Sequence, residues 1–226
     1  MGSRGLSARR QVRFTTRITS TVPATRSGDT VIVPADPNGV GREADGTEQN
    51  PTQAALTEAR SIELGIRADP IESLHFVDDT GRVVFSATGG RDYVVVPPEA
   101  MIAARNMTLT HNHPRGSSFS LEDIQIAAGA NVLQMRVVGN VNALGKAYTY
   151  TMTRPADGWR SVGLDKIQDS FRKNDGAVRA ANWSKITAAP FAERNSMIKT
   201  AEANHYHQVW QRVSKELGLR YRREAK

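Results

Sequence analysis

The chain has 226 residues, a formal net charge of +7 and no cysteine. This length suits one domain of catalytic size with extensions, and the lack of cysteine excludes disulfides and thiolate ligands, so a metal site must use His, Asp and Glu. No apolar stretch approaches the roughly 18 residues of a membrane span, and no secretory signal follows the first arginines. We therefore expect a cytoplasmic protein whose basic surface suits an acidic partner, with nucleic acid as one candidate.

The first 52 residues are rich in Gly, Ser, Thr, Pro and Arg and lack a sustained helical period. Such a segment cannot bury enough apolar surface by itself. The composition therefore predicts an extended arm over 1–52 that binds a partner subunit. We expect the main domain over 53–154 and a helical appendage over 155–226.

Within the main domain the apolar pattern changes from a helical period to short strands. In chain order it predicts a helix over 52–69, a hairpin of strands over 71–77 and 82–87, a strand over 93–96 and a short helix over 97–102. It then predicts a strand over 107–110 that runs into two histidines, a helix over 120–130, and strands over 133–138 and 146–153. These elements predict an α/β (α+β) fold with a mixed sheet flanked by helices.

Beyond Pro155 the pattern becomes that of amphipathic helices. Their aromatic residues are expected to pack in the core and between helices: Trp159, Phe171, Trp183, Phe191 and Trp210. The chain ends in a basic tip of Arg220, Arg222, Arg223 and Lys226. We expect this appendage to pack on the main domain or on another subunit.

A candidate metal site follows the fourth predicted strand. His111 and His113 lie two residues apart at a strand end, so their side chains project to the same side. Pro114 and Gly116 then turn the chain, and Asp123, one turn into the next helix, can bring its carboxylate back toward the histidines. Three protein ligands with an open fourth position suit a catalytic zinc ion.

Each part of this pattern has a simpler interpretation. A pair of histidines two residues apart is more often polar structure than a ligand pair. Ser120 and Asp123 also fit a helix N-cap paired with an acid in the first turn, and Asn112 can merely belong to a turn.

The other histidines are expected to be structural or exposed. His75 is assigned a structural role. His205 and His207 also lie two residues apart, but on a helix their side chains diverge by about 200°, so they are expected at the surface and not on one ion.

The run His111-Asn112-His113-Pro114, followed by Gly116 and by Ser-x-x-Asp over 120–123, resembles the JAB/JAMM (MPN) metalloprotein family, particularly its RadC-like branch. The resemblance covers roughly 70–138 and implies a JAB/MPN-like sheet. It also implies that His111, His113 and Asp123 bind zinc and that Ser120 polarises the scissile carbonyl or holds the oxyanion. By the same resemblance Glu72 accepts a proton from the attacking water, with Glu63 as the alternative acid.

The function expected from this resemblance is zinc-dependent hydrolysis of an amide or isopeptide bond. Similar His-Asn-His-Pro segments in C-terminal domains of phage head-morphogenesis and polymorphic-toxin proteins suggest an alternative, a virion-associated assembly component of a phage-like particle. A metal-dependent nuclease is a second alternative, suggested by the basic charge and by the order His-Asn-His.

Overall fold

The computed structural model describes residues 49–225, so the predicted arm and its expected partner contacts lie outside the described residues, apart from 49–52. The helices are α1 (Gln53–Ile66), α2 (Pro98–Ala103), α3 (Leu121–Gly129), α4 (Trp159–Val162), α5 (Leu164–Ala188) and α6 (Phe191–Leu217). The strands are β1 (Ser73–Val77), β2 (Val83–Thr88), β3 (Thr108–His113), β4 (Gln134–Gly139), β5 (Tyr148–Thr153) and β6 (Arg220–Ala225). None of the described helices combines the length and apolarity that a bilayer span requires.

The strands form one six-stranded mixed sheet in the order β2-β1-β3-β4-β5-β6. Among the strands of residues 49–225 only β3 and β4 pair in parallel, and every other neighbouring pair is antiparallel. The predicted α+β fold with a mixed sheet is therefore confirmed, including the hairpin of β1 and β2.

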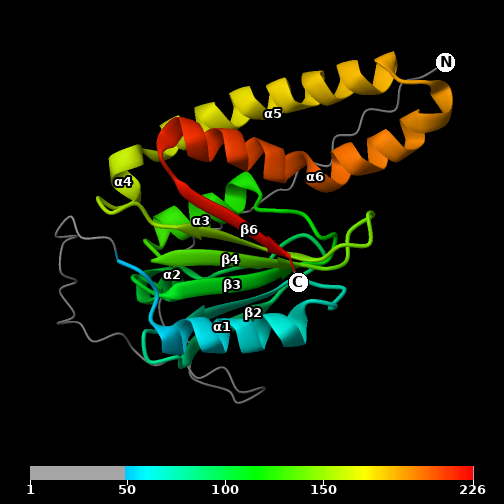
Figure 1. Cartoon of the computed structure of the whole chain (residues 1–226). Coiled ribbons are helices and arrows are strands. Elements are labelled where there is room, and N and C mark those ends of the chain that lie inside the picture. The colour runs from blue at the N-terminus through cyan, green and yellow to red at the C-terminus, as the bar shows by residue number, and fades with distance from the viewer. Residues whose placement is uncertain (1–48, 226) are drawn as a thin grey trace.

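Helices cover both faces of this sheet (Figure 1). On one face α1 contacts β3 and β1, and its Glu63 carboxylate accepts hydrogen bonds from the Arg136 guanidinium and the Thr110 hydroxyl. The other face carries the main hydrophobic core, where strand residues such as Leu109 pack with residues of α3 and α6, among them Trp210. Apolar and polar side chains of the central strands are thus divided between the two faces by their alternation.

The strand predicted over 93–96 is wrong, because this segment pairs with no described strand. The β1–β2 ladder continues through Gly89 and Gly90, and the Gly90 amide then donates to the Tyr93 carbonyl, which turns the chain away from the sheet. Val94 and Val96 still pack against the core from this extended segment. Their alternation with exposed residues gives the sequence pattern of a strand, although the backbone of this segment pairs with no described strand.

The appendage predicted to be helical over 155–226 ends instead in a strand. Gly218 ends α6 with a left-handed φ of +67°, and β6 then pairs antiparallel with β5 at the sheet edge. The charged run Arg220-Tyr221-Arg222-Arg223 hid this strand, since only one of these residues is apolar. The C-terminal segment therefore completes the sheet of the main domain.

The predicted packing of the aromatic residues is confirmed for Trp159, Phe171 and Trp210, which are buried in the core. It is wrong for Trp183 and Phe191, which are 64% and 85% exposed. These two lie near the turn where α5 meets α6, beyond the reach of the sheet.

A chain of hydrogen bonds links α6, β6 and the loop that precedes α3. The Tyr221 hydroxyl lies 2.8 Å from Nδ1 of His207 and 2.8 Å from the Ser118 Oγ. The expected surface position is therefore wrong for His207, which is buried, whereas His205 turns away to contact Asp175. The expected divergence of the two histidines is confirmed, because they face different partners.

We predict that acid destabilises the fold through His207. Burial, together with the positive charge of Arg223, lowers the pKa of His207 from 6.5 to about 4. Its neutral form is thus favoured by folding, and this stabilisation, complete above pH 6.5, is lost as the pH falls toward 4. The loss amounts to about 3 kcal/mol, since one pKa unit corresponds to about 1.4 kcal/mol.

Urea unfolding of the wild type and of His207→Gln across this pH range measures the effect. The difference in unfolding free energy between the two proteins should shrink as the pH falls. A difference that stays constant with pH would contradict the prediction.

Candidate metal centre

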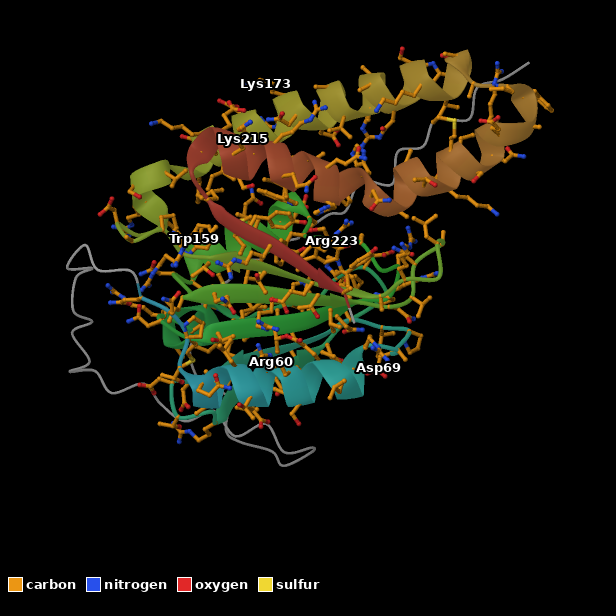
Figure 2. The ribbon with its side chains drawn as sticks, viewed as in Figure 1. Arg60, Asp69, Trp159, Lys173, Lys215 and Arg223 are labelled. Carbon is orange, nitrogen blue, oxygen red and sulfur yellow. The ribbon has the colours of Figure 1, made fainter. Side chains whose placement is uncertain are left out.

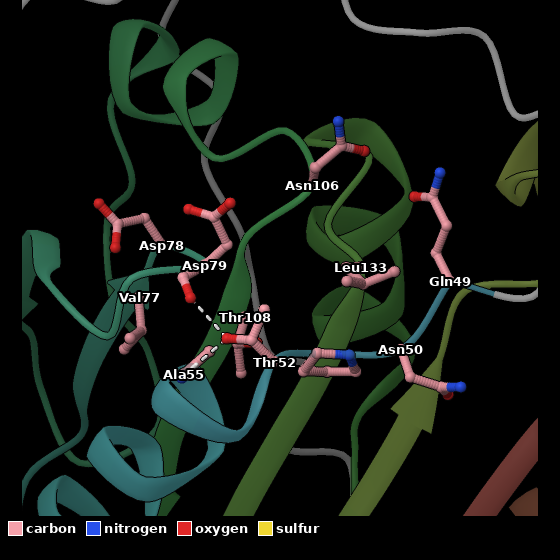
Figure 3. Close-up of a pocket in the computed structure, with 11 residues that line it drawn as sticks. Gln49, Asn50, Thr52, Ala55, Val77, Asp78, Asp79, Asn106, Thr108 and Leu133 are labelled. Carbon is pink, nitrogen blue, oxygen red and sulfur yellow. Dashed lines mark hydrogen bonds between the residues drawn. The ribbon is translucent and has the colours of Figure 1, made fainter.

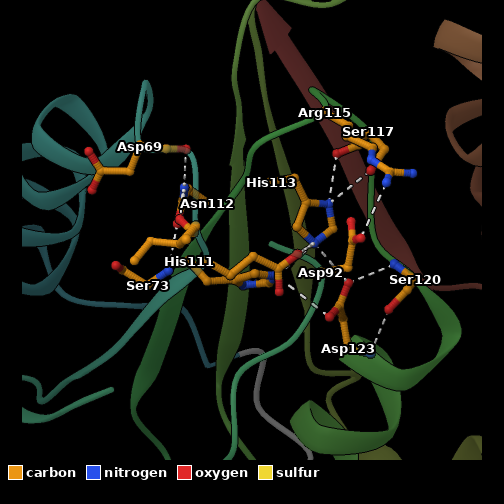
Figure 4. Close-up of polar contacts among 12 residues, drawn as sticks. Asp69, Ser73, Asp92, His111, Asn112, His113, Arg115, Ser117, Ser120 and Asp123 are labelled. Carbon is orange, nitrogen blue, oxygen red and sulfur yellow. Dashed lines mark hydrogen bonds and ion pairs between the residues drawn. The ribbon is translucent and has the colours of Figure 1, made fainter. Parts of the chain in front are cut away.

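The two histidines at the end of β3 face the same side of the sheet, as their spacing predicts. Every residue of β3 is buried, because β1 and β4 flank the strand and helices cover both faces. The Nε2 atoms of His111 and His113 lie 3.1 Å apart, with the rings edge to face. The imidazoles are thus presented together from a rigid central strand (Figure 4).

A tight turn after His113 sends the chain back toward this pair. The His113 carbonyl accepts hydrogen bonds from the amides of Gly116 and Asn140. Gly116 adopts a left-handed φ of +71°, and a Cβ there would lie 2.5 Å from the Asn140 carbonyl oxygen. Only glycine fits this approach, so Gly116 lets the loop pack on the end of β4 before α3 begins.

Asp123 in the first turn of α3 completes the group. Its carboxylate oxygens lie 3.6 Å from Nε2 of His111 and 3.3 Å from Nε2 of His113. Potential ligand atoms of the three residues all lie within 4.8 Å of one another, so the group can hold a metal ion. The predicted convergence of these residues is confirmed.

The simpler interpretation of Ser120 and Asp123 is confirmed as well. The Ser120 hydroxyl accepts a hydrogen bond from the Asp123 amide, and the Ser120 amide donates to Oδ2 of Asp123 at 2.6 Å. This capping box holds the Asp123 carboxylate in place at the helix start. One side chain therefore both caps α3 and faces the histidines.

The ionised carboxylate of Asp123 and the hydrogen bonding of the His113 ring suit the binding of a cation. Burial raises the pKa of Asp123, but the positive charges and hydrogen bonds of His111 and His113 lower it more, so the net pKa lies well below its usual range. Nδ1 of His113 lies 3.0 Å from the Ser117 carbonyl oxygen, to which it can only donate. When the ring is neutral, this tautomer has its Nε2 lone pair directed at the cluster, as metal-binding histidines require.

Glu72 is the acid beside this cluster. It precedes β1, is buried, and places Oε1 3.9 Å from Nε2 of His113. Its backbone bonds to Gly89 and Gly90 hold it at the sheet end. Glu63 forms an ion pair with Arg136 and accepts a hydrogen bond from Thr110. Thr110 and His111 are consecutive residues of β3 and point to opposite faces, so Glu63 lies on the face of the sheet away from the cluster.

Asn112 has a role that the sequence interpretation missed by assigning it to a turn. Its side chain is buried on the opposite face of β3, where Oδ1 accepts from the Ser73 amide at 2.7 Å and Nδ2 donates to the Ile71 carbonyl at 2.9 Å. These bonds fix the backbone of Ile71 and Ser73, the residues on either side of Glu72. Its place between two candidate ligands on a central strand was the available signal, since such a residue must find partners on the other face.

A separate pocket lies at the other end of β3 (Figure 3). It has a volume of about 270 Å³, and its lining includes Thr52, Asp79, Thr108 and Leu133. Thr108 begins β3 and His113 ends it, so the length of the strand separates this pocket from the histidines.

Comparisons of the chain with family models, with curated proteins and with solved structures find no match.

We predict that the cluster binds one divalent transition-metal ion per chain and that His111→Ala abolishes this binding. The substitution removes one of three ligands, and the remaining two cannot enclose the ion. Metal content after dialysis, together with the absorption of Co²⁺ in the visible range, measures the effect.

His75→Ala is the matched control, because His75 lies on the neighbouring β1 but contacts Ser86 outside the cluster. It should bind metal as the wild type does. Equal metal binding by His111→Ala and the wild type would rule out the cluster as the site.

Proposed function

We propose that the chain is a zinc-dependent hydrolase of amide bonds, either peptide or isopeptide. The observation that carries the proposal is the buried convergence of His111, His113 and Asp123 with Glu72 beside them. Two imidazoles and a carboxylate are the donor set that catalytic zinc sites use. A zinc ion held there would lower the pKa of a bound water and polarise the substrate carbonyl.

Glu72 supplies the acid–base chemistry in this proposal. Its carboxylate lies outside the ligand group but close to it, so Oε1 can take a proton from the attacking water. The same oxygen then returns the proton to the leaving nitrogen, which departs as a neutral amine. The resemblance to the JAB/JAMM family assigns Glu72 the same role.

Ser120 is the proposed donor to the oxyanion. Its oxygen accepts from the Asp123 amide as the helix cap, which leaves the hydroxyl hydrogen for another acceptor. The cap fixes this hydroxyl beside the carboxylate that faces the histidines. Ser120 therefore both holds Asp123 and offers a hydrogen bond to the reacting carbonyl.

We predict that Glu72→Gln keeps zinc but lowers turnover by about 10²- to 10⁴-fold, the usual contribution of a general acid–base group. Asp123→Ala should lose both zinc and turnover. Metal content and cleavage of internally quenched peptides and of a Lys-linked isopeptide, all with the zinc-loaded protein, measure the two effects.

Glu122→Gln is the matched control, since this acid neighbours Asp123 in the first turn of α3 but lies outside the cluster. It should leave turnover unchanged. Wild-type turnover by Glu72→Gln, or no cleavage of either substrate class by the zinc-loaded wild type, would refute the proposal.

A second candidate function, assembly with other subunits, is favoured by the tip of the α5–α6 hairpin. The two helices pack side by side through contacts such as Lys173–Glu216, and their tip projects beyond the sheet (Figure 1). Trp183 and Phe191 expose 64% and 85% of their surface there. Large aromatic residues in an exposed position mark a binding surface.

We predict that the full chain self-associates and that Trp183→Ser combined with Phe191→Ser reduces the association by removing apolar contact area. Sedimentation velocity measures the oligomeric state. Leu64→Ser, at a 72% exposed position on α1, is the control and should have no effect. A monomeric wild type would exclude self-assembly through this tip.

A further inference from the structure

The edge strand β6 carries an arginine, Arg223, that forms no ion pair with an acid of the described part of the chain. The Arg223 guanidinium lies 4.4 Å from the centre of the Tyr148 ring, and its Nη1 donates to Oδ1 of Asn204 on α6 at 2.9 Å. Throughout residues 49–225 no carboxylate forms an ion pair with it. Figure 2 shows Arg223 on β6 below α6. The stacking and the amide contact hold the guanidinium in place while most of its N–H groups stay available.

A second polar group beside Arg223 points to a ligand. Tyr150 pairs in register with Arg223 on the neighbouring strand and is fully buried, and its hydroxyl oxygen faces the Arg223 guanidinium, which can only donate to it. Burial raises the pKa of Tyr150, an effect that the charge of Arg223 and its hydrogen bond to the hydroxyl only partly offset. Because no described acceptor takes the hydroxyl hydrogen, it is left for an anion held by Arg223.

These groups share a face and a row with the proposed catalytic centre. His111 pairs with Val137, Val137 with Tyr150 and Tyr150 with Arg223, so the four form one line across β3, β4, β5 and β6. Three strand spacings separate the first and last backbones by about 14 Å. An extended peptide covers that distance in about four residues.

We propose that Arg223, Tyr148 and the Tyr150 hydroxyl form a subsite for a carboxylate of the substrate. The carboxylate belongs either to an Asp or Glu side chain within about four residues of the scissile bond or to the C-terminus of the substrate. This inference rests on the proposed hydrolase function, for which it defines the substrate class.

The geometry favours a carboxylate over a nucleic-acid backbone. The planar guanidinium and one hydroxyl match the two oxygens of a carboxylate. Phosphate tracking requires several cations along a groove, but Arg222 points to the opposite face of β6. Arg220 is occupied by the Arg154 carbonyl and by residues 49 and 50.

The test measures peptide binding to the metal-free full chain, so that it does not depend on catalysis. The probes are three N-acetylated pentapeptides observed by NMR titration: Gly-Gly-Glu-Gly-Gly amide, pentaglycine with a free carboxyl group, and pentaglycine amide. We expect at least one acidic peptide to bind about tenfold more tightly than pentaglycine amide, as a charge-assisted bidentate contact allows. The acidic peptide that binds identifies the source of the carboxylate.

Arg223→Gln should remove this preference, and Arg222→Gln, an identical charge change on the adjacent residue, should keep it. If Arg223→Gln does not fold, Arg223→Lys keeps the charge but loses the planar fork, and should weaken the acidic peptide several-fold. Equal binding of all three peptides, or equal effects of the changes at positions 222 and 223, overturns the proposal. Binding of a single-stranded oligonucleotide that both variants weaken equally, without any peptide preference, assigns the charge to nucleic acid instead.

The two proposals fail separately. Arg223-dependent peptide binding without zinc uptake or cleavage would retain the carboxylate subsite and reject the hydrolase. Cleavage without any preference for acidic peptides would retain the hydrolase and reject the subsite.

Discussion

The central position of β3 is the constraint on which the site depends. Its backbone bonds to β1 on one side and to β4 on the other, so the strand cannot rotate and its side chains must alternate between two covered faces. His111 and His113 therefore emerge together on the α3 side. Thr110 and Asn112 emerge on the α1 side, where Glu63 and the residues at the start of β1 supply their partners. A shift of one residue in register would exchange the two sets and dismantle the cluster.

The parallel pairing of β3 with β4 brings Asp123, the third residue of the cluster, next to the histidines. Parallel neighbours need a crossover connection, and here that connection is the loop after His113 followed by α3. The crossover must start at the end of β3, so the first turn of α3 lies next to the histidines. The capping box of Ser120 and Asp123 then sets the carboxylate angle. The crossover brings the start of α3 to the histidines, and the helix cap then orients the Asp123 carboxylate toward them; both are needed to place this side chain.

The C-terminal segment supports the same end of the sheet from the other side. β6 pairs with β5, and its Tyr221 hydroxyl contacts Ser118 in the loop between the histidines and α3. The loop also meets His113 through Ser117. The helical hairpin and β6 therefore hold the crossover loop in position through these contacts. Arg223 of the proposed carboxylate subsite lies on the same strand, β6. An alteration of α6 or β6 would reach the cluster through these contacts.

Local spacing in the sequence by itself determined the helices and most strands, the common face of His111 and His113, and the capping box at Ser120. Each of these follows from side-chain periodicity or from hydrogen bonds between residues a few positions apart. Only the tertiary structure decided that Glu72 lies beside the cluster while Glu63 pairs with Arg136, that Asn112 grips the start of β1, and that the basic C-terminus is a strand. These outcomes depend on which distant segments pair and on which face each covers, and no local pattern carries that information.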